Sequence, residues 1–175
     1  LAQFILCGLY TGSRKQTILS LHINTPTIHG GYVDTVAGIL YRKPQGKRMT
    51  AKRQTPARLP GTYLARVRRL AAMGRRYVVE DHRGNRVGDI RKGWANAKAL
   101  AEAIAKAQGI DLDLSDVTPH TLKHTAITWA LQTGATIWDA AGYFGTSVYT
   151  IERVYGHHSP DHQKSAVEAF NRRGR

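Results

Sequence analysis

One stretch of this sequence predicts both a buried helix and a polar site beside it: Thr118-Pro119-His120-Thr121-Leu122-Lys123-His124-Thr125-Ala126-Ile127-Thr128-Trp129. Threonine is a good N-cap and proline is tolerated in a first turn, so we expect a helix to begin at residues 118–119, with His120 in its first turn. Helical spacing gives this helix a polar face with His120, Lys123, His124 and Ile127, and an apolar face with Leu122, Ala126, Trp129 and Ala130. For this helix alone, a solvated edge explains the polar residues as well as a functional site does.

The composition is that of a folded, strongly basic domain. The 175 residues are 42% hydrophobic and carry a net charge of +14. Residues 41–100 hold seventeen of the basic residues and three acidic ones. Such an excess predicts a polyanionic partner, most often nucleic acid. A membrane surface is the competing partner, but no apolar run approaches the ~20 residues that span a bilayer, so we expect no membrane association.

Cysteine usage indicates the compartment. Cys7 is the only cysteine and lies in an apolar run, which excludes an internal disulfide framework and a thiolate metal site. Residues 1–10 lack the basic start and the cleavage site of a signal peptide, and we expect them to form an interior helix. These features predict a reducing, cytoplasmic setting.

The hydrophobic periodicity predicts an α+β domain that is mostly helical. Besides the central helix, helices are expected at 1–10, 61–73, 89–108, 138–144, 148–154 and 161–173. Strands are expected at 18–23 and, bent at a glycine, at 31–41, and residues 42–59 predict a hairpin with a cationic tip. Together they would form a small antiparallel sheet. No internal repeat is present.

The first predicted helix leads into a turn that carries an arginine. Gly12 suits the position just past a helix end, where a positive φ is required. Arg14 follows on the turn, and a planar guanidinium displayed there can bind a phosphate through two parallel hydrogen bonds. An arginine in a surface loop is the commoner reason for such a residue.

Three segments of the chain form a recognisable set: Tyr10-Thr11-Gly12-Ser13-Arg14, Thr118-Pro119-His120-Thr121-Leu122-Lys123-His124-Thr125 and Thr150-Ile151-Glu152-Arg153-Val154-Tyr155-Gly156-His157. Together they resemble the tyrosine recombinase, or phage integrase, catalytic domain. They occur in the family's order and at about its spacings, and the resemblance covers nearly all of residues 1–175. It implies a catalytic-domain fragment without the family's N-terminal core-binding and arm-binding domains. It also implies that residues 159–175 hold a C-terminal helix that is exchanged between subunits.

The resemblance implies the site residues one by one. Tyr155 matches the nucleophile, Arg14 the first active-site arginine and His120 the histidine of the second box. Lys52, eight residues before Pro60, matches the family's hairpin lysine, and Lys47 and Lys43 are the alternative candidates for this position. Two positions depart from the family: Lys123 stands in place of an arginine, and Thr146 in place of a histidine or tryptophan. Thr146 and His157 are further candidates for binding phosphate.

These residues suit DNA strand cleavage and rejoining through a 3′-phosphotyrosyl intermediate. Such chemistry needs a phenolic nucleophile, positive donors around the phosphate and a proton for the departing 5′ oxygen. Tyr155 is the expected nucleophile, Arg14 and Lys123 are the donors around the phosphate, and Lys52 supplies the proton. His120 accepts the phenolic proton or binds a phosphate oxygen. No metal or other cofactor is expected. The resemblance implies double-stranded DNA as the partner, a homo-tetramer on DNA, a monomer or dimer without it, and a bacterial or phage-encoded protein.

Three other interpretations remain open. Lysine at position 123 loses the bidentate geometry of arginine, which favours a weakened enzyme or a DNA-binding protein of the same fold that no longer cleaves. A type IB topoisomerase shares the mechanism on a related fold. A zinc hydrolase is indicated by His120 and His124 at i, i+4 with His157, His158 and His162, although no glutamate follows His120.

Overall fold

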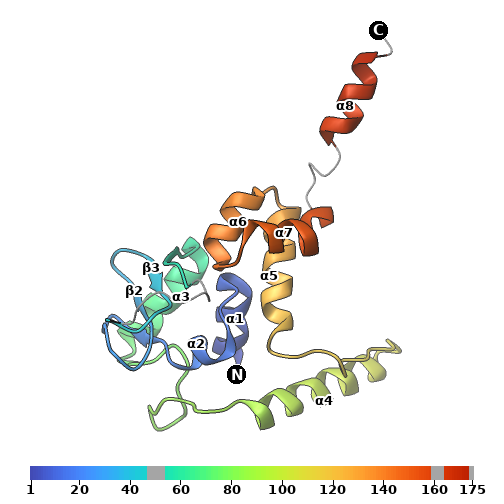
Figure 1. Cartoon of the computed structure of the whole chain (residues 1–175). Coiled ribbons are helices and arrows are strands. Elements are labelled where there is room, and N and C mark those ends of the chain that lie inside the picture. Colours follow the sequence, from blue (N-terminus) through green and yellow to red (C-terminus); the bar gives the residue numbers. More distant parts are fainter. Residues whose placement is uncertain (47–53, 159–163, 174–175) are drawn as a thin grey trace.

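The computed structural model describes residues 1–46, 54–158 and 164–173 of the chain (Figure 1). Within them the helices are α1 (Ala2–Thr11), α2 (Lys15–Leu19), α3 (Gly61–Ala72), α4 (Arg91–Ala107), α5 (Thr121–Gln132), α6 (Ile137–Phe144), α7 (Val148–Tyr155), the short 3-10 helix η1 (Gly156–His158) and α8 (Lys164–Arg173). The strands are β1 (His22–Ile23), β2 (Tyr32–Asp34), β3 (Ile39–Tyr41) and β4 (Ala57–Arg58). The predicted α+β, mostly helical class is confirmed.

The central helix begins slightly later than predicted. α5 starts at Thr121, and His120 is its N-cap residue rather than part of its first turn. The Thr121 hydroxyl accepts a hydrogen bond from the backbone N–H of Thr118 at 3.1 Å, so residues 118–120 form a turn that leads into the helix. This turn places His120 at the N-terminal end of α5.

The sheet is mixed rather than antiparallel throughout. Its strand order is β1-β2-β3-β4, in which β1 runs parallel to β2 while β2, β3 and β4 pair antiparallel. The predicted strand at 18–23 is wrong in its first part, because residues up to Leu19 belong to α2. Ile18, Leu19 and Leu21 are all buried, so their side chains do not alternate between two faces as those of a half-buried strand would.

Two hydrophobic clusters form the core. The first joins α1 and α2 to the sheet and α3, around Phe4, Leu21, Leu40 and Val67. The second joins α5, α6 and α7 and includes Tyr155 itself. α5 packs against α1, α6, α7 and η1, so this helix connects the two clusters.

Two glycines allow α1 to pack closely against α5 and the end of α6. A Cβ at Gly8 would lie 2.6 Å from a methyl carbon of Leu122 on α5. Gly12 ends α1 with φ of +57°, as predicted, and a Cβ there would lie 2.4 Å from the ring of Phe144. The chain therefore turns tightly beside the end of α6, and Ser13 and Arg14 leave α1 at that point.

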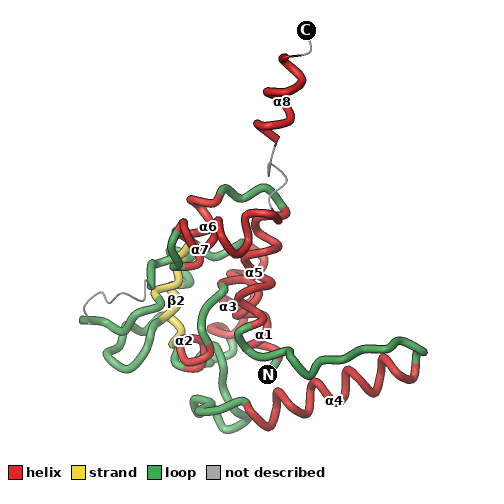
Figure 2. Tube along the Cα trace, turned by 45° about the vertical axis from the view of Figure 1, so that its right-hand side comes forward, coloured by secondary structure: helices red, strands yellow, loops and turns green. Residues whose placement is uncertain are grey.

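Two helices lie at the periphery. Figures 1 and 2 show α4 extending along one side of the molecule and α8 standing apart from the other helices. Every α8 residue whose side chain is described, from Val167 to Arg172, is exposed. None of the helices in the described ranges is long and apolar enough to cross a membrane.

Candidate active site

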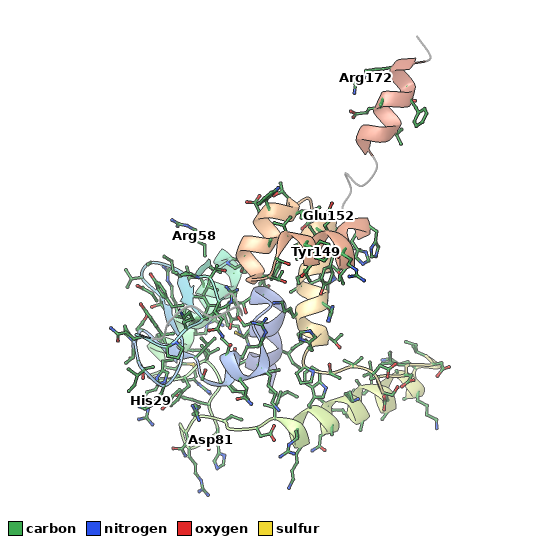
Figure 3. The ribbon with its side chains drawn as sticks, in the orientation of Figure 1. His29, Arg58, Asp81, Tyr149, Glu152 and Arg172 are labelled. Carbon is green, nitrogen blue, oxygen red and sulfur yellow. The ribbon has the colours of Figure 1, made fainter. Side chains whose placement is uncertain are left out.

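Tyr155 lies at the end of α7 and points into the molecule. Ser147 caps this helix by accepting a hydrogen bond from the backbone N–H of Thr150 at 3.1 Å. Ile151 and Tyr155, four residues apart, form its buried face, whereas Tyr149 and Glu152 lie on the exposed one (Figure 3). Burial raises the pKa of Tyr155, so the phenol is neutral near neutral pH.

The Tyr155 hydroxyl contacts a histidine that the sequence indicated only as a zinc ligand. It lies 2.6 Å from Nδ1 of His124 on α5. The His120 ring stands edge-on to that of His124, with 4.7 Å between the ring centres. The only sequence signal for His124 was its i, i+4 spacing from His120 on the polar face of the helix, which had indicated a metal site.

His120 is held in its neutral form. Burial lowers its pKa, and the neighbouring His124, Lys123 and Arg14 lower it further. His120 and Lys123 lie at the N-terminal end of α5, and the charge of Arg14, at the start of α2, lowers the pKa of both.

Lys123 is buried, although it was predicted to lie on a polar face. Its ammonium group donates a hydrogen bond to the backbone oxygen of Phe144, the last residue of α6, at 3.0 Å. Burial, together with the positive charges of Arg14 and Arg42, lowers its pKa to about 8. Trp129, predicted to point inward, is 54% exposed instead. The helix is thus rotated so that its cation, and not its indole, faces the neighbouring helix.

Arg14 begins α2 as its N-cap residue, and its side chain is exposed. The next residue, Lys15, forms a salt bridge with Asp89 at 2.8 Å, which ties the start of α2 to the segment before α4. A cation on a tethered, exposed turn remains available to an anionic ligand.

Arg42 does not belong to an exposed cationic tip, as the hairpin prediction had it. Its guanidinium is buried and donates to the Ser13 hydroxyl at 3.1 Å and to the backbone oxygens of Thr11 at 2.8 Å and Thr55 at 2.6 Å. It therefore fixes the turn that carries Arg14 to both sides of the hairpin base. No pattern in the sequence separates this arginine from its basic neighbours.

The base of the hairpin is also attached to α6. The Thr55 hydroxyl donates to the backbone oxygen of Gly142 at 2.6 Å, and the Tyr143 hydroxyl donates to the backbone oxygen of Tyr10 at 2.8 Å. Lys43 is half-buried at the start of this segment. Lys47 and Lys52 lie outside the described residues.

Thr146 and His157 flank Tyr155 in the chain. Thr146 follows the left-handed Gly145 that ends α6, and its backbone N–H donates to the oxygen of Ala141 at 3.1 Å. His157 lies in η1, with its ring 3.9 Å from that of His158. Among the hydrogen bonds of residues 1–46, 54–158 and 164–173, none joins Arg14, Thr146 or His157 to Tyr155.

The zinc interpretation finds no support in the described ranges. They contain no group of three or more His, Cys, Asp or Glu side chains that could hold a metal ion. His162 lies outside these ranges. What the arrangement offers instead is a neutral phenol in contact with an imidazole, with cationic side chains nearby, and this can activate an oxygen nucleophile against an anionic substrate.

The sequence is similar to those of named recombinases. No family model matches the chain. It is 25% identical over 166 residues to the tyrosine recombinase XerD of two Listeria monocytogenes strains, serotype 4b F2365 and serovar 1/2a EGD-e. The match covers 93% of this chain and 52% of each relative, so the chain spans about half the length of the curated relatives it matches.

Solved structures share the fold. The catalytic domain of bacteriophage HP1 integrase matches with a TM-score of 0.54 and 19% identity, covering 95% of this chain and 79% of that one. The crystal structure of XerA recombinase matches with a TM-score of 0.56 and 18% identity, covering 97% and 62%. The sequence likeness and the fold agree along nearly the whole chain. The chain therefore has the fold of a tyrosine recombinase catalytic domain.

Proposed function

We propose that this chain is the catalytic part of a site-specific DNA recombinase, an integrase that cleaves and rejoins DNA strands through Tyr155. The observation that carries the proposal is the contact between the Tyr155 hydroxyl and a histidine, in a site bordered by Arg14, His120 and Lys123. The similarity to proteins named tyrosine recombinase supports it.

The proposed reaction needs no bound cofactor, because cationic side chains can supply the charge that stabilises the phosphate. Arg14 and Lys123 are assigned to the phosphate oxygens, where negative charge grows as the nucleophile attacks. His120, held neutral, is assigned to a phosphate oxygen as well. Thr146 and His157 are proposed as further phosphate contacts. Lys52 is assigned, from the sequence alone, as the proton donor for the departing 5′ oxygen.

Double-stranded DNA is the proposed partner, on the strength of charge. The net charge of +14 favours a polyanion, and a groove of about 530 Å³ beside His120 includes Arg91 and Lys98 in its lining. Arg58 extends into solvent from β4 (Figure 3). A DNA-acting protein with a single buried thiol and no disulfide is proposed to work inside the cell.

Covalent trapping tests the proposed activity. A pool of duplexes with random sequence, each with a nick near the central position, is incubated with the chain, and adducts that survive denaturing gels are isolated and sequenced. We expect adducts with the wild-type chain and none with Tyr155→Phe, which keeps the ring but lacks the nucleophilic oxygen. Adducts that persist with Tyr155→Phe would refute the nucleophile.

The same pool separates two enzyme classes. Enrichment of one sequence among the trapped duplexes supports a recombinase that recognises its own site. Adducts without enrichment, together with relaxation of supercoiled DNA, would indicate a type IB topoisomerase instead.

A non-cleaving DNA-binding protein is the second candidate, and the position of Lys123 favours it. This lysine donates to a backbone oxygen of α6, and it lacks the two-pronged donor geometry of an arginine. Loss of one transition-state donor costs about 3 kcal/mol, or roughly a hundredfold in rate. DNA binding without adducts by the wild-type chain, with adducts restored by Lys123→Arg, would identify this second function.

Assembly into a tetramer on DNA completes the proposal. α8 stands apart and exposes Val167 and Phe170, which are 56% and 72% accessible and lie three residues apart on one face. An apolar groove of about 450 Å³ between α1, α5 and α6 contains Tyr10, Trp129 and Tyr143. We assign this groove to α8 of a neighbouring subunit, because each apolar surface would cover the other.

A further inference from the structure

The contact between Tyr155 and His124 has a direction that matters for catalysis. At 2.6 Å, the oxygen and Nδ1 share one proton, and either atom can be the donor. If Nδ1 accepts, the imidazole carries its own proton on Nε2 and holds the phenol ready to be deprotonated. If Nδ1 donates, the histidine blocks a lone pair of the oxygen that must attack.

The surroundings favour acceptance by Nδ1. A neutral phenol always has a proton to give, and burial holds Tyr155 in this form. His124 is also exposed, so a charge gained on its ring can be hydrated. The His120 ring contacts the ring of His124. Among the described residues, no hydrogen bond joins His120 to the Tyr155 oxygen.

We propose that His124 is a catalytic residue, the general base that accepts the phenolic proton of Tyr155, and that His120 does not fill this role. The inference rests on the proposed function. As the Tyr155 oxygen forms its bond to phosphorus, its proton moves to Nδ1 of His124. The bond from phosphorus to the 5′ oxygen breaks, and that oxygen leaves with the electron pair and takes a proton from a lysine ammonium group. Rejoining reverses both proton transfers.

The first test reads the direction of the hydrogen bond without DNA. Nitrogen NMR of the chain labelled at its histidine rings distinguishes the two neutral forms of each imidazole. We expect His124 to carry its proton on Nε2, and we expect the Nδ1 signal to shift in Tyr155→Phe, where the donor is gone. A proton fixed on Nδ1 would overturn the proposal.

The second test separates proton transfer from positioning. Asn at position 124 places an amide oxygen near the position of Nδ1, so it can still accept the hydrogen bond but cannot keep the proton. We expect His124→Asn to slow adduct formation about a hundredfold, in the range that general bases contribute. Dissolved imidazole should restore part of the rate to His124→Ala, because the site is open to solvent. His120→Asn is the matched control and should gain nothing from imidazole.

The outcomes distinguish two failures. A wild-type chain that forms no adduct would overturn the proposed function and, with it, this role of His124. Adducts formed equally fast by wild type and His124→Asn would overturn the role of His124 alone.

Discussion

At the scale of single residues, Lys123 has the clearest consequences, because its ammonium group is buried and donates to the backbone oxygen of Phe144.

The pKa of Lys123 predicts how activity depends on pH. A lysine with a pKa lowered to about 8 is charged below that pH and loses its charge as the pH rises through it. If this charge stabilises the phosphate, adduct formation at low DNA concentration should fall up to about tenfold for each pH unit above 8. Lys123→Arg should remove that alkaline decline, since arginine stays protonated. The measurement is the adduct rate of both forms from pH 7 to 10; parallel profiles would contradict the assignment.

The same residue predicts a change in stability with pH. Between the folded pKa of about 8 and the ordinary value of 10.5, the unfolded chain binds more protons at this lysine than the folded one does. Raising the pH through this window therefore increases the contribution of Lys123 to the free energy of unfolding, and below it the buried charge is a cost. Urea unfolding at pH 7.5 and 9.5 should show a smaller gain, or a larger loss, for Lys123→Arg than for the wild-type chain.

Arg42 predicts a large structural effect. Arg42→Met would leave two backbone oxygens and a hydroxyl without their donor in a buried site. We expect the free energy of unfolding to fall by about 3 kcal/mol, measured by urea titration. Arg58→Met on β4 is the matched control, because this arginine is exposed, and it should change stability by less than about 0.5 kcal/mol. Equal losses in both variants would show that the Arg42 contacts are not what holds the turn.

The resemblance pointed to Arg14, His120, Lys123 and Tyr155, but it did not reveal the contacts between side chains. The contact of Tyr155 with His124 was missed because the two residues lie 31 positions apart in the chain. Burial of Lys123 was missed because its acceptor is a backbone oxygen, which no side-chain pattern reveals.

At the scale of elements, the amphipathic periodicity and the glycines at helix ends predicted most of the helices. Gly12 marked the end of α1, and the helix predicted at 148–154 is α7, which ends one residue later. The failures are short or depend on packing. α2 has five residues, too few for a period to be visible, and its run of Ile and Leu suits a strand equally well. The face of α5 could not be oriented from its sequence, because α6 and not composition decides which side is covered.

Gly12 allows this packing to be tested. Gly12→Ala would force a side chain into a left-handed backbone and place a methyl group 2.4 Å from a ring carbon of Phe144. We expect a loss of about 3 kcal/mol in the free energy of unfolding. Gly74→Ala is the control, with φ of +76° and no atom within 4 Å of its Cβ, and should cost about 1 kcal/mol. If the two variants lose the same amount, the Phe144 contact has no energetic weight.

At the scale of the whole molecule, the net charge of +14 predicts a polyanionic partner. The position of α8 could not be foreseen, because its sequence does not say whether its own domain or another subunit covers its apolar face. In the structure, the side chains from Val167 to Arg172 are exposed.

A substitution on α8 should affect assembly without affecting the fold. With Phe170→Asp we expect the same thermal midpoint as wild type, because this ring is 72% exposed, but loss of the tetramer on a duplex carrying the selected site. Analytical ultracentrifugation with DNA measures the species present. Val36→Asp, at an apolar residue 88% exposed on the turn between β2 and β3, is the control and should assemble normally. Tetramers formed by Phe170→Asp would exclude α8 from the contact.

The hydrogen bond from Thr55 to Gly142 mechanically couples two parts of the molecule that are 87 residues apart in sequence. Two residues beyond Gly142, the Phe144 oxygen holds Lys123. A force that displaces the segment containing Thr55 must either break this link or move α6, whose Phe144 oxygen accepts the hydrogen bond from Lys123. A load applied at that segment therefore reaches the buried ammonium group of Lys123 through the last turn of α6.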